Sequence, residues 1–324
     1  MKSLRAFFKG VLVVGLLVAL LGVGPGYAAE LQPVKISYLP IIDLLQLYVA
    51  WEKGFFEGEG LKVEGQSVPG GAVSQTLVES GSVDLGWTAV VPLSQAYVKG
   101  FQFAFIAPGN FVDTTNRSTV AIVVKKDSPV QSVKDLAGKT IAVNGINSVN
   151  HLSVLSIADF NKVDIKGLKF MEVNFPMQPA AIKEGSVQAA SMNQPFLAMA
   201  ESEGTVRQLY PGFFPPEVAP RYMVSSWFTK KDSMEKNKDK IGRYLRAINK
   251  ATDFISKNPD QMPDIAAKYT KLDVNLIRKV TLPKFFPKVQ KKDIQVQIDL
   301  CTKYGFIQKG FDAKEIVADF MTLE

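Results

Sequence analysis

The sequence predicts an α/β protein of two lobes, with a helical C-terminal region that packs on the first lobe. Three observations lead to this fold class. Segments that alternate apolar and polar residues are followed by apolar helical segments, which is typical of a sheet covered by helices on both faces. One helix-and-strand pattern occurs twice, and the last third has helical periodicity. A chain of 324 residues with 47% hydrophobic and 21% charged residues is long and apolar enough for two cores.

The first 28 residues have the composition of an export signal. Lys2, Arg5 and Lys9 form a positive region, a thirteen-residue apolar and glycine run follows at 11–23, and small residues surround Ala28. This run is too short for a membrane-spanning helix, which needs about 20 residues. We expect cleavage near Ala28. Because no cysteine lies near the cut, we expect a freely diffusing periplasmic protein and not a lipid-anchored one.

The first lobe is expected to alternate strands and helices from its start. The predicted segments are a strand at 34–39, a helix at 44–50, a strand at 61–64, a helix at 73–79 and a short strand that ends at Trp87. Asp43 is predicted to cap the first of these helices, since Asp is a preferred N-cap residue.

A repeated pattern predicts a second lobe of similar winding. In residues 72–87 and again in 178–193, a polar turn starts a helix, Gly-Ser-Val ends it, and a short apolar strand leads to another turn. The alternative is coincidence between two common helix endings. If the repeat is real, the turns of the two lobes face one another across a cleft, because ligands of such sheets bind beyond the carboxyl ends of the strands.

The remaining segments complete this division. Strands are predicted at 119–124 and near 140–143, helices near 133 and at 149–161, a return strand at 222–228, and an amphipathic helical region after 231. We therefore expect lobe 1 to hold 29–116, lobe 2 to hold 117–221, and 222–324 to return to lobe 1 as C-terminal helices.

Residue counts exclude most catalytic and metal-binding classes. Cys301 is the only cysteine and His151 the only histidine, so no internal disulfide, multi-cysteine metal site or Cys/His protease is expected. No G-x-S-x-G turn, Walker loop or G-x-G-x-x-G fingerprint occurs. We predict a protein that is not an enzyme and needs no metal or cofactor, with Cys301 as a small core residue.

The basic charge is concentrated in the last third of the chain. Residues 221–324 hold 21 basic and 13 acidic side chains, whereas 29–220 hold 14 and 18. A basic segment can contact nucleic acid, a membrane or an acidic partner. Here the lysines alternate with acids and helical apolar positions, so we expect a solvated surface and no nucleic-acid partner.

The strongest ligand-site motif is the Gly- and Asn-rich loop at 144–151. A loop of this kind that enters a helix leaves backbone N–H groups free to bind an anion or polar head group. Asn147 or Ser148 can also simply cap the helix. His151 falls in the first helical turn, where the helix dipole disfavours its protonation, so we expect a neutral hydrogen-bonding role.

Three weaker motifs end or follow other predicted strands. Gly70 and Gly71 open a second helix that carries Gln75, and glycine permits close approach of a ligand. Trp87 and Thr88 end a buried strand, where Trp87 can stack on a ligand or fill the core. The turn from Asn193 offers two amides and an aromatic ring. Arg117, near the first crossover, is more simply a structural surface residue.

Three segments carry a resemblance to a known family: residues 47–61 (LYVAWEKGFFEGEGL), 81–86 (GSVDLG) and 133–143 (VKDLAGKTIAV). On these residues the chain resembles the periplasmic substrate-binding proteins of ABC importers, in the nitrate/sulfonate/taurine group that also includes binders of thiamine-precursor pyrimidines. The resemblance implies a two-lobe type II periplasmic binding protein (Venus-flytrap) fold, which closes on one small molecule and delivers it to a membrane permease.

The resemblance also implies where ligand contacts lie. The candidate ligand-binding residues are Pro40, Ile42, Asp43, Gly70, Gly71, Gln75, Trp87, Thr88, Asn147, Ser148, His151, Asn193, Gln194 and Phe196. Two positions depart from the family pattern: Gln188 stands where the second lobe usually has Asp, and Gln194 where Glu usually precedes Pro-Phe. The loss of a carboxylate beside the cleft favours an anionic or neutral ligand over a cationic one.

The predicted function is capture of a small organic anion, sulfonate-like or aromatic and carboxylate-bearing, by lobe closure. The expected partners are this small molecule and an ABC permease at the inner membrane, and the protein is expected to be a monomer. A neutral heterocycle such as a pyrimidine is the alternative ligand. An enzyme on the same bilobal fold and a periplasmic ligand sensor are the alternative functions.

Overall fold

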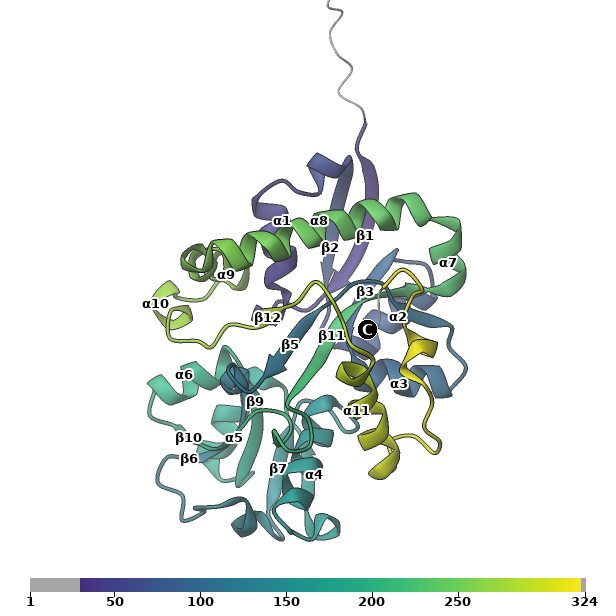
Figure 1. The fold of residues 1–324 in the computed structure, drawn as a ribbon. Coiled ribbons are helices and arrows are strands. Elements are labelled where there is room, and N and C mark those ends of the chain that lie inside the picture. The colour runs from purple at the N-terminus through teal and green to yellow at the C-terminus, as the bar shows by residue number, and fades with distance from the viewer. Residues whose placement is uncertain (1–29, 322–324) are drawn as a thin grey trace, which may run out of the picture. The chain divides into compact units, whose positions relative to one another are not determined.

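The computed structural model describes residues 30–321, so the predicted export signal lies outside the described residues. The strands form two sheets, which occupy the upper and lower halves of Figure 1. We call each sheet with its covering helices a lobe. The first sheet has the order β12-β5-β11-β3-β1-β2, with β4 also paired to β11, and the second has the order β10-β6-β9-β7-β8.

The bounds of the strands in the first sheet are β1 Gln32–Tyr38, β2 Leu61–Ser67, β3 Leu85–Ala89, β4 Phe103–Phe105, β5 Asn110–Asp113, β11 Arg221–Lys230 and β12 Lys284–Phe285. Strands β1, β2 and β3 are parallel, so their carboxyl ends meet at one edge of the sheet. The long strand β11 runs antiparallel between β3 and β5. The first sheet is therefore mixed.

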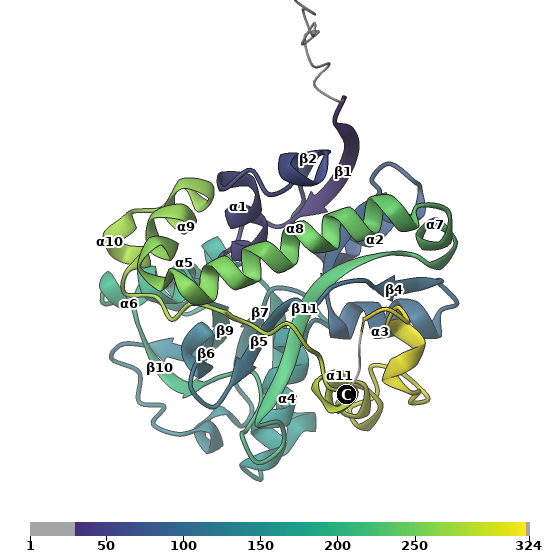
Figure 2. The ribbon, with the colours of Figure 1, turned by 45° about the horizontal axis from the view of Figure 1, so that its top comes forward.

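Helices cover both faces of the first sheet. Their bounds are α1 Leu45–Glu52, α2 Gly71–Glu79, α3 Val90–Val98, α7 Lys231–Lys236, α8 Lys238–Lys257, α9 Met262–Thr270, α10 Val274–Ile277 and α11 Lys291–Lys303. Figure 2 shows α8 running across the sheet beside α1. The apolar side of α8, with Ile241, Tyr244 and Ile248 fully buried, packs in one hydrophobic cluster with α1. The predicted return of the C-terminal helices to the first lobe is confirmed.

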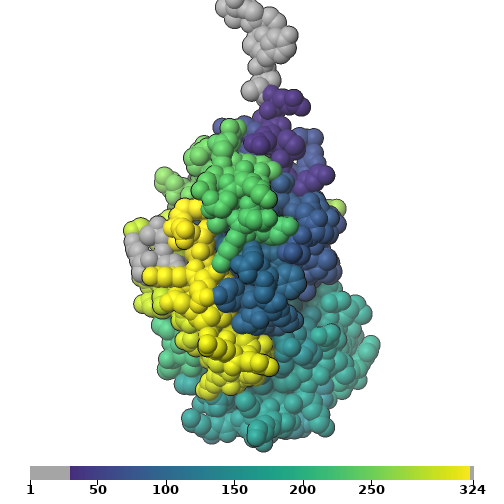
Figure 3. Space-filling view, turned by 90° about the vertical axis from the view of Figure 1, so that its right-hand side faces the viewer, coloured from purple at the N-terminus to yellow at the C-terminus, as the bar shows by residue number. Residues whose placement is uncertain are grey.

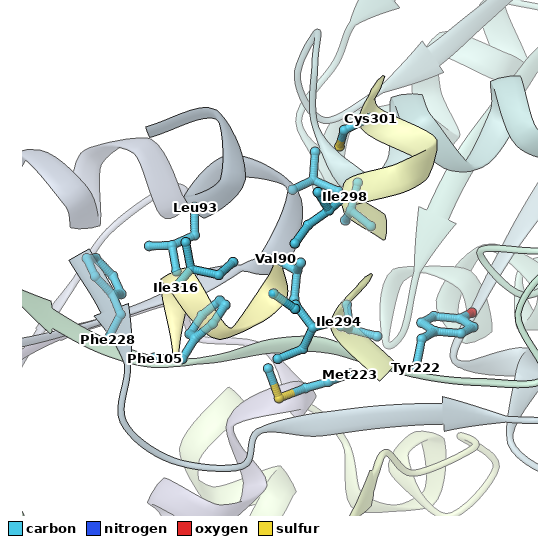
Figure 4. Close-up of a cluster of buried hydrophobic side chains, with 14 of the residues drawn as sticks. Val90, Leu93, Phe105, Tyr222, Met223, Phe228, Ile294, Ile298, Cys301 and Ile316 are labelled. Atoms are coloured by element: carbon cyan, nitrogen blue, oxygen red, sulfur yellow. The ribbon is translucent and has the colours of Figure 1, made fainter. Parts of the chain in front are cut away.

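A second hydrophobic cluster fills the opposite face. Figure 4 shows its side chains converging from α3, β4, β11, α11 and the 3-10 turn Ala313–Ile316. Cys301 of α11 is fully buried here, and burial raises the pKa of its thiol to about 12, so it is the core residue that the sequence predicts. Figure 3 shows the C-terminal segment (yellow) against the segment around α3, where the rings of Tyr97 and Phe311 lie 4.3 Å apart.

The second sheet contains β6 Val120–Lys125, β7 Thr140–Val143, β8 Lys169–Glu172, β9 Ala189–Asn193 and β10 Val206–Pro211, with helices α4 Val149–Phe160, α5 Gln178–Glu184 and α6 Phe196–Ser202. Two further hydrophobic clusters cover its two faces. The repeated sequence pattern is a real structural repeat: α2 precedes β3 in the first lobe and α5 precedes β9 in the second.

Two chain segments connect the sheets. One runs from β5 to β6 and the other from β10 to β11. Arg117 lies in the first of them, half-buried, and its guanidinium donates hydrogen bonds to the carbonyls of Pro211 and Phe214 in the second. It therefore ties the two connections together.

Two local predictions need correction. The predicted cap of the first helix is wrong: the N-cap of α1 is Leu44, and Asp43 lies one residue earlier, inside the 3-10 turn Ile42–Leu44. The short helix predicted near 133 is the 3-10 turn Val133–Leu136, closed by a capping box between Ser132 and Asp135.

Candidate functional site

The candidate residues lie at the carboxyl ends of strands in both sheets. In the first lobe they follow β1, β2 and β3, and in the second lobe they follow β7 and β9. Parallel strands that end at one edge bring their following loops together, which is where ligands of α/β sheets bind. The geometry of each loop decides what it can bind.

The N-terminus of α2 presents hydrogen-bond donors that the protein does not use. No side chain caps this helix, so the N–H groups of its first turn remain available. The Oγ1 atom of Thr88 and the Nε2 atom of Gln75 are buried and have no hydrogen-bond partner. Thr88 can lie against the start of α2 because residue 71 is glycine. A Cβ at this position would lie far inside van der Waals distance of the Thr88 hydroxyl. Hydroxyl, amide and helix N–H groups together favour a ligand with acceptor atoms.

Asp43, which follows β1, is the acidic residue among the candidates. It is 9% exposed, and its side chain makes no hydrogen bond or ion pair within the described residues. Burial raises the pKa of this carboxyl to about 7, since removal from water disfavours the charged form. Its neighbour Ile42 is fully buried in the hydrophobic cluster of α1 and α8, whereas Pro40 is exposed.

The N-terminus of α4 in the second lobe is largely occupied by the protein's own groups. Ser148 accepts a hydrogen bond from the His151 N–H (3.3 Å), so it is an N-cap as the sequence allows. The Asn147 N–H donates to His151 Nδ1 (3.0 Å), and the Ile146 N–H donates to Glu172 Oε1 (2.6 Å). This loop therefore has fewer free donors than the sequence suggests.

His151 is neutral, as predicted, but for a different reason. Its ring packs against Phe170 and Phe306, with centroids 4.2 and 5.0 Å away. Burial lowers the pKa of the imidazole to about 4. Desolvation of the ring, which the sequence does not reveal, causes this shift, whereas the prediction relied on the helix dipole.

Gln194 is engaged within the protein on both sides of its amide. Nε2 donates to the Ser118 carbonyl (3.1 Å), and Oε1 accepts from the Ala198 N–H (3.1 Å) at the start of α6. A glutamate could not donate to Ser118. The departure from the family pattern at this position thus has a structural explanation that does not involve a ligand.

The side chains of the two aromatic candidates pack against other apolar groups of the protein. Trp87 is 6% exposed and belongs to the hydrophobic cluster of α1 and α8. Phe196 stacks on Phe175, with centroids 6.1 Å apart, and lines a surface cavity of about 320 Å³ between α5 and α6.

One polar residue of the predicted 144–151 motif was not singled out among the candidate ligand-binding residues. Asn150, 1% exposed in the first turn of α4, donates through Nδ2 to Ser191 and to Asn193 Oδ1 (2.8 Å) at the end of β9. Its position in the first turn of a helix whose later residues are mostly apolar is the signal that could have revealed it.

One hydrogen bond joins residues of the two lobes near the site. Gln95 Nε2 of α3 donates to the Asn147 carbonyl (2.7 Å) in the loop before α4. Val149 and Leu152 of α4 also share a hydrophobic cluster with α3 and α11. The loop before α4 is thus in contact with the first lobe.

Within residues 30–321, no group of three or more His, Cys, Asp or Glu side chains is placed to hold a metal ion. None of the described helices has the length and apolar character needed to cross a membrane.

Comparisons with known proteins agree with this architecture. The family described as "NMT1/THI5 like" matches residues 42–262, more than half of the chain. A putative thiamine biosynthesis protein of Haemophilus influenzae is 25% identical, with 98% of this chain and 99% of the relative covered. A putative aliphatic sulfonates-binding protein of Bacillus subtilis is also 25% identical, with 95% and 94% covered.

The fold is that of a solved periplasmic binding protein. The periplasmic aliphatic sulphonate binding protein SsuA from Escherichia coli superimposes with a TM-score of 0.74 at 20% identity, over 90% of this chain and 98% of that one. The two-lobe periplasmic binding fold that the sequence predicts is confirmed.

Proposed function

Because the chain belongs to the NMT1/THI5-like family, in which ABC periplasmic binding proteins occur, we propose that it captures a small organic anion and delivers it to an ABC permease at the inner membrane. It acts in the periplasm after removal of the export signal, and it works as a monomer. The two lobes close on the ligand, because the closed state gains contacts from both strand-end edges.

The unpaired hydrogen-bond donors of the first lobe are the observation that favours an anionic ligand. A buried donor without a partner costs about 1–3 kcal/mol, and an acceptor on the ligand removes that cost on binding. Thr88 and Gln75 supply two such donors beside the open N-terminus of α2. An anionic head group, a sulfonate or a carboxylate, provides several acceptor oxygens and also interacts favourably with the helix N-terminus.

The protein binds this solute without transforming it. The only cysteine is a core thiol whose pKa burial raises to about 12, so it is not a nucleophile. The only histidine packs between two phenylalanine rings and accepts a backbone hydrogen bond through Nδ1. Neither residue is available as a nucleophile or general base.

A neutral heterocycle is the second candidate ligand, and Asp43 favours it. A buried carboxyl with a pKa of about 7 and no partner can accept a hydrogen bond from a ring or exocyclic N–H. An aminopyrimidine offers such donors together with ring acceptors.

Binding measurements on the purified chain test the proposal. Calorimetry with ethanesulfonate, benzoate and 4-aminopyrimidine separates the two ligand classes. Thr88→Val, which keeps the side-chain shape, is expected to weaken anion binding at least tenfold while leaving stability unchanged or up to about 1 kcal/mol higher, because the buried hydroxyl is unpaired.

Thr76→Val, the same substitution at an exposed position of α2, is the matched control and should leave binding unchanged. Anion binding that survives Thr88→Val, or binding of 4-aminopyrimidine alone, would contradict the anion assignment.

A further inference from the structure

A buried carboxamide supports the end of β9 in the second lobe. The Nδ2 atom of Asn150 lies 3.2 Å from the carbonyl oxygen of Ser191, 2.9 Å from its Oγ, and 2.8 Å from Oδ1 of Asn193. Asn150 is 1% exposed, so these contacts are shielded from water. The group thus links the first turn of α4 to the strand end where the ligand is proposed to bind.

The Ser191 carbonyl fixes the direction of this network. A carbonyl oxygen only accepts hydrogen bonds, so the NH2 group of Asn150 must face the strand. The same NH2 group faces Asn193, whose amide must therefore turn its oxygen toward Asn150. The Nδ2 atom of Asn193 then points away from this network, and it has no hydrogen-bond partner within the described residues.

We propose that Asn150 is a positioning residue that makes Asn193 a hydrogen-bond donor toward the ligand. The assignment of the ligand contact rests on the proposed function, whereas the orientation of the Asn193 amide does not. With Thr88 and Gln75 in the first lobe, donors then face the ligand from both lobes. The solute accordingly has acceptors at two positions: an anionic head group, and a second acceptor such as a hydroxyl or carbonyl oxygen.

Asn150→Asp tests the positioning role when binding is measured above about pH 9, where the buried carboxyl is ionised, because it then keeps the shape and removes the donor. The new carboxylate repels the Ser191 carbonyl and accepts from Asn193, whose amide turns its oxygen outward. We expect affinity for 2-hydroxyethanesulfonate, which has both acceptors, to fall at least tenfold. Asn161→Asp, the same change at the far end of α4, is the control and should have no effect.

A double-mutant cycle distinguishes positioning from general damage to the fold. In an Asn193→Ala background, Asn150→Asp should change affinity by less than twofold, since the group through which it acts is gone. An equal loss in both backgrounds would overturn the proposal. If Asn150→Asp does not fold, Asn193→Asp reverses the polarity directly at a residue that is 9% exposed, and the same tenfold loss is expected.

Exchange of side-chain amide protons tests the orientation without any ligand. In the wild-type protein the Asn193 NH2 protons, assigned by their loss in Asn193→Ala, should exchange rapidly with water, and in Asn150→Asp they should be protected. Slow exchange in the wild type that is unchanged by Asn150→Asp would overturn the proposal. If exchange is as expected but no anionic probe binds, the proposed ligand class is wrong and the orientation stands.

Discussion

At the scale of single residues, Asp43 predicts an unusual dependence of stability on pH. Burial raises the pKa of this carboxyl from 3.8 to about 7, so between these values the folded protein holds a proton that the unfolded chain releases. The free energy of unfolding therefore falls as pH rises through this window, by at most about 4 kcal/mol for the full shift. The substitution Asp43→Asn removes this dependence of stability on pH. Urea unfolding at pH 5 and pH 8 should show Asp43→Asn gaining stability relative to wild type at pH 8.

The comparison of variant with wild type is needed because His151 acts in the opposite sense. Burial lowers the pKa of its ring to about 4, so protonation of the unfolded chain below its ordinary value of 6.5 favours unfolding as pH falls. The contribution of His151 to stability is the same in wild type and in Asp43→Asn, so it cancels in the difference between them. Asp260→Asn, at an exposed position, serves as the control, and an equal pH response of Asp43→Asn and wild type would contradict the prediction.

At the scale of elements, the packing of α2 against β3 depends on the absence of a side chain at Gly71. In Gly71→Ala the new methyl group would collide with Thr88, so either the helix start or the threonine must move. We expect a loss of about 1–3 kcal/mol in thermal unfolding and weaker ligand binding. Gly58→Ala, where no atom lies within 4 Å of the added Cβ, should change neither quantity. Unaltered binding in Gly71→Ala would show that this helix start does not contact the ligand.

The elements differ in how far the sequence alone reveals them. β1 and α8 are predictable because their apolar residues repeat with the period of a strand and of a helix. The strand β12 has two residues and exists only through its pairing with β5, so no local pattern marks it. The same holds for the site: Gly71 and Thr88 lie in local motifs, but the hydrogen bond from Gln194 to the Ser118 carbonyl joins residues 76 positions apart.

At the scale of the whole molecule, residues from the C-terminal part of the first lobe form ion pairs with β5 and β11, the two strands that connect this lobe to the second. Lys284 of β12 pairs with Asp113 of β5 (2.9 Å), and Arg221, the first residue of β11, pairs with the fully buried Asp293 of α11 (3.0 Å). Burial raises the pKa of the Asp293 carboxyl despite this pairing. Arg221→Met leaves that carboxyl without its cation, and we expect a loss of about 3 kcal/mol in urea unfolding.

The exposed pair of Arg278 and Asp264 provides the matched comparison. Arg278→Met should cost less than about 1 kcal/mol, because both partners lie in water. Losses of similar size in the two variants would show that the pair at the start of β11 contributes no more than a surface contact.

The hydrophobic cluster that α4 shares with α3 and α11 limits how the lobes can rotate. A movement that separated Leu152 from these helices would expose apolar surface to water, at about 25 cal/mol for each Å². We therefore expect the rotation of lowest cost to keep its axis close to this cluster. If the lobes close on a solute as proposed, closure about such an axis would change one angle only, and less entropy would be lost than if the lobes moved freely relative to one another.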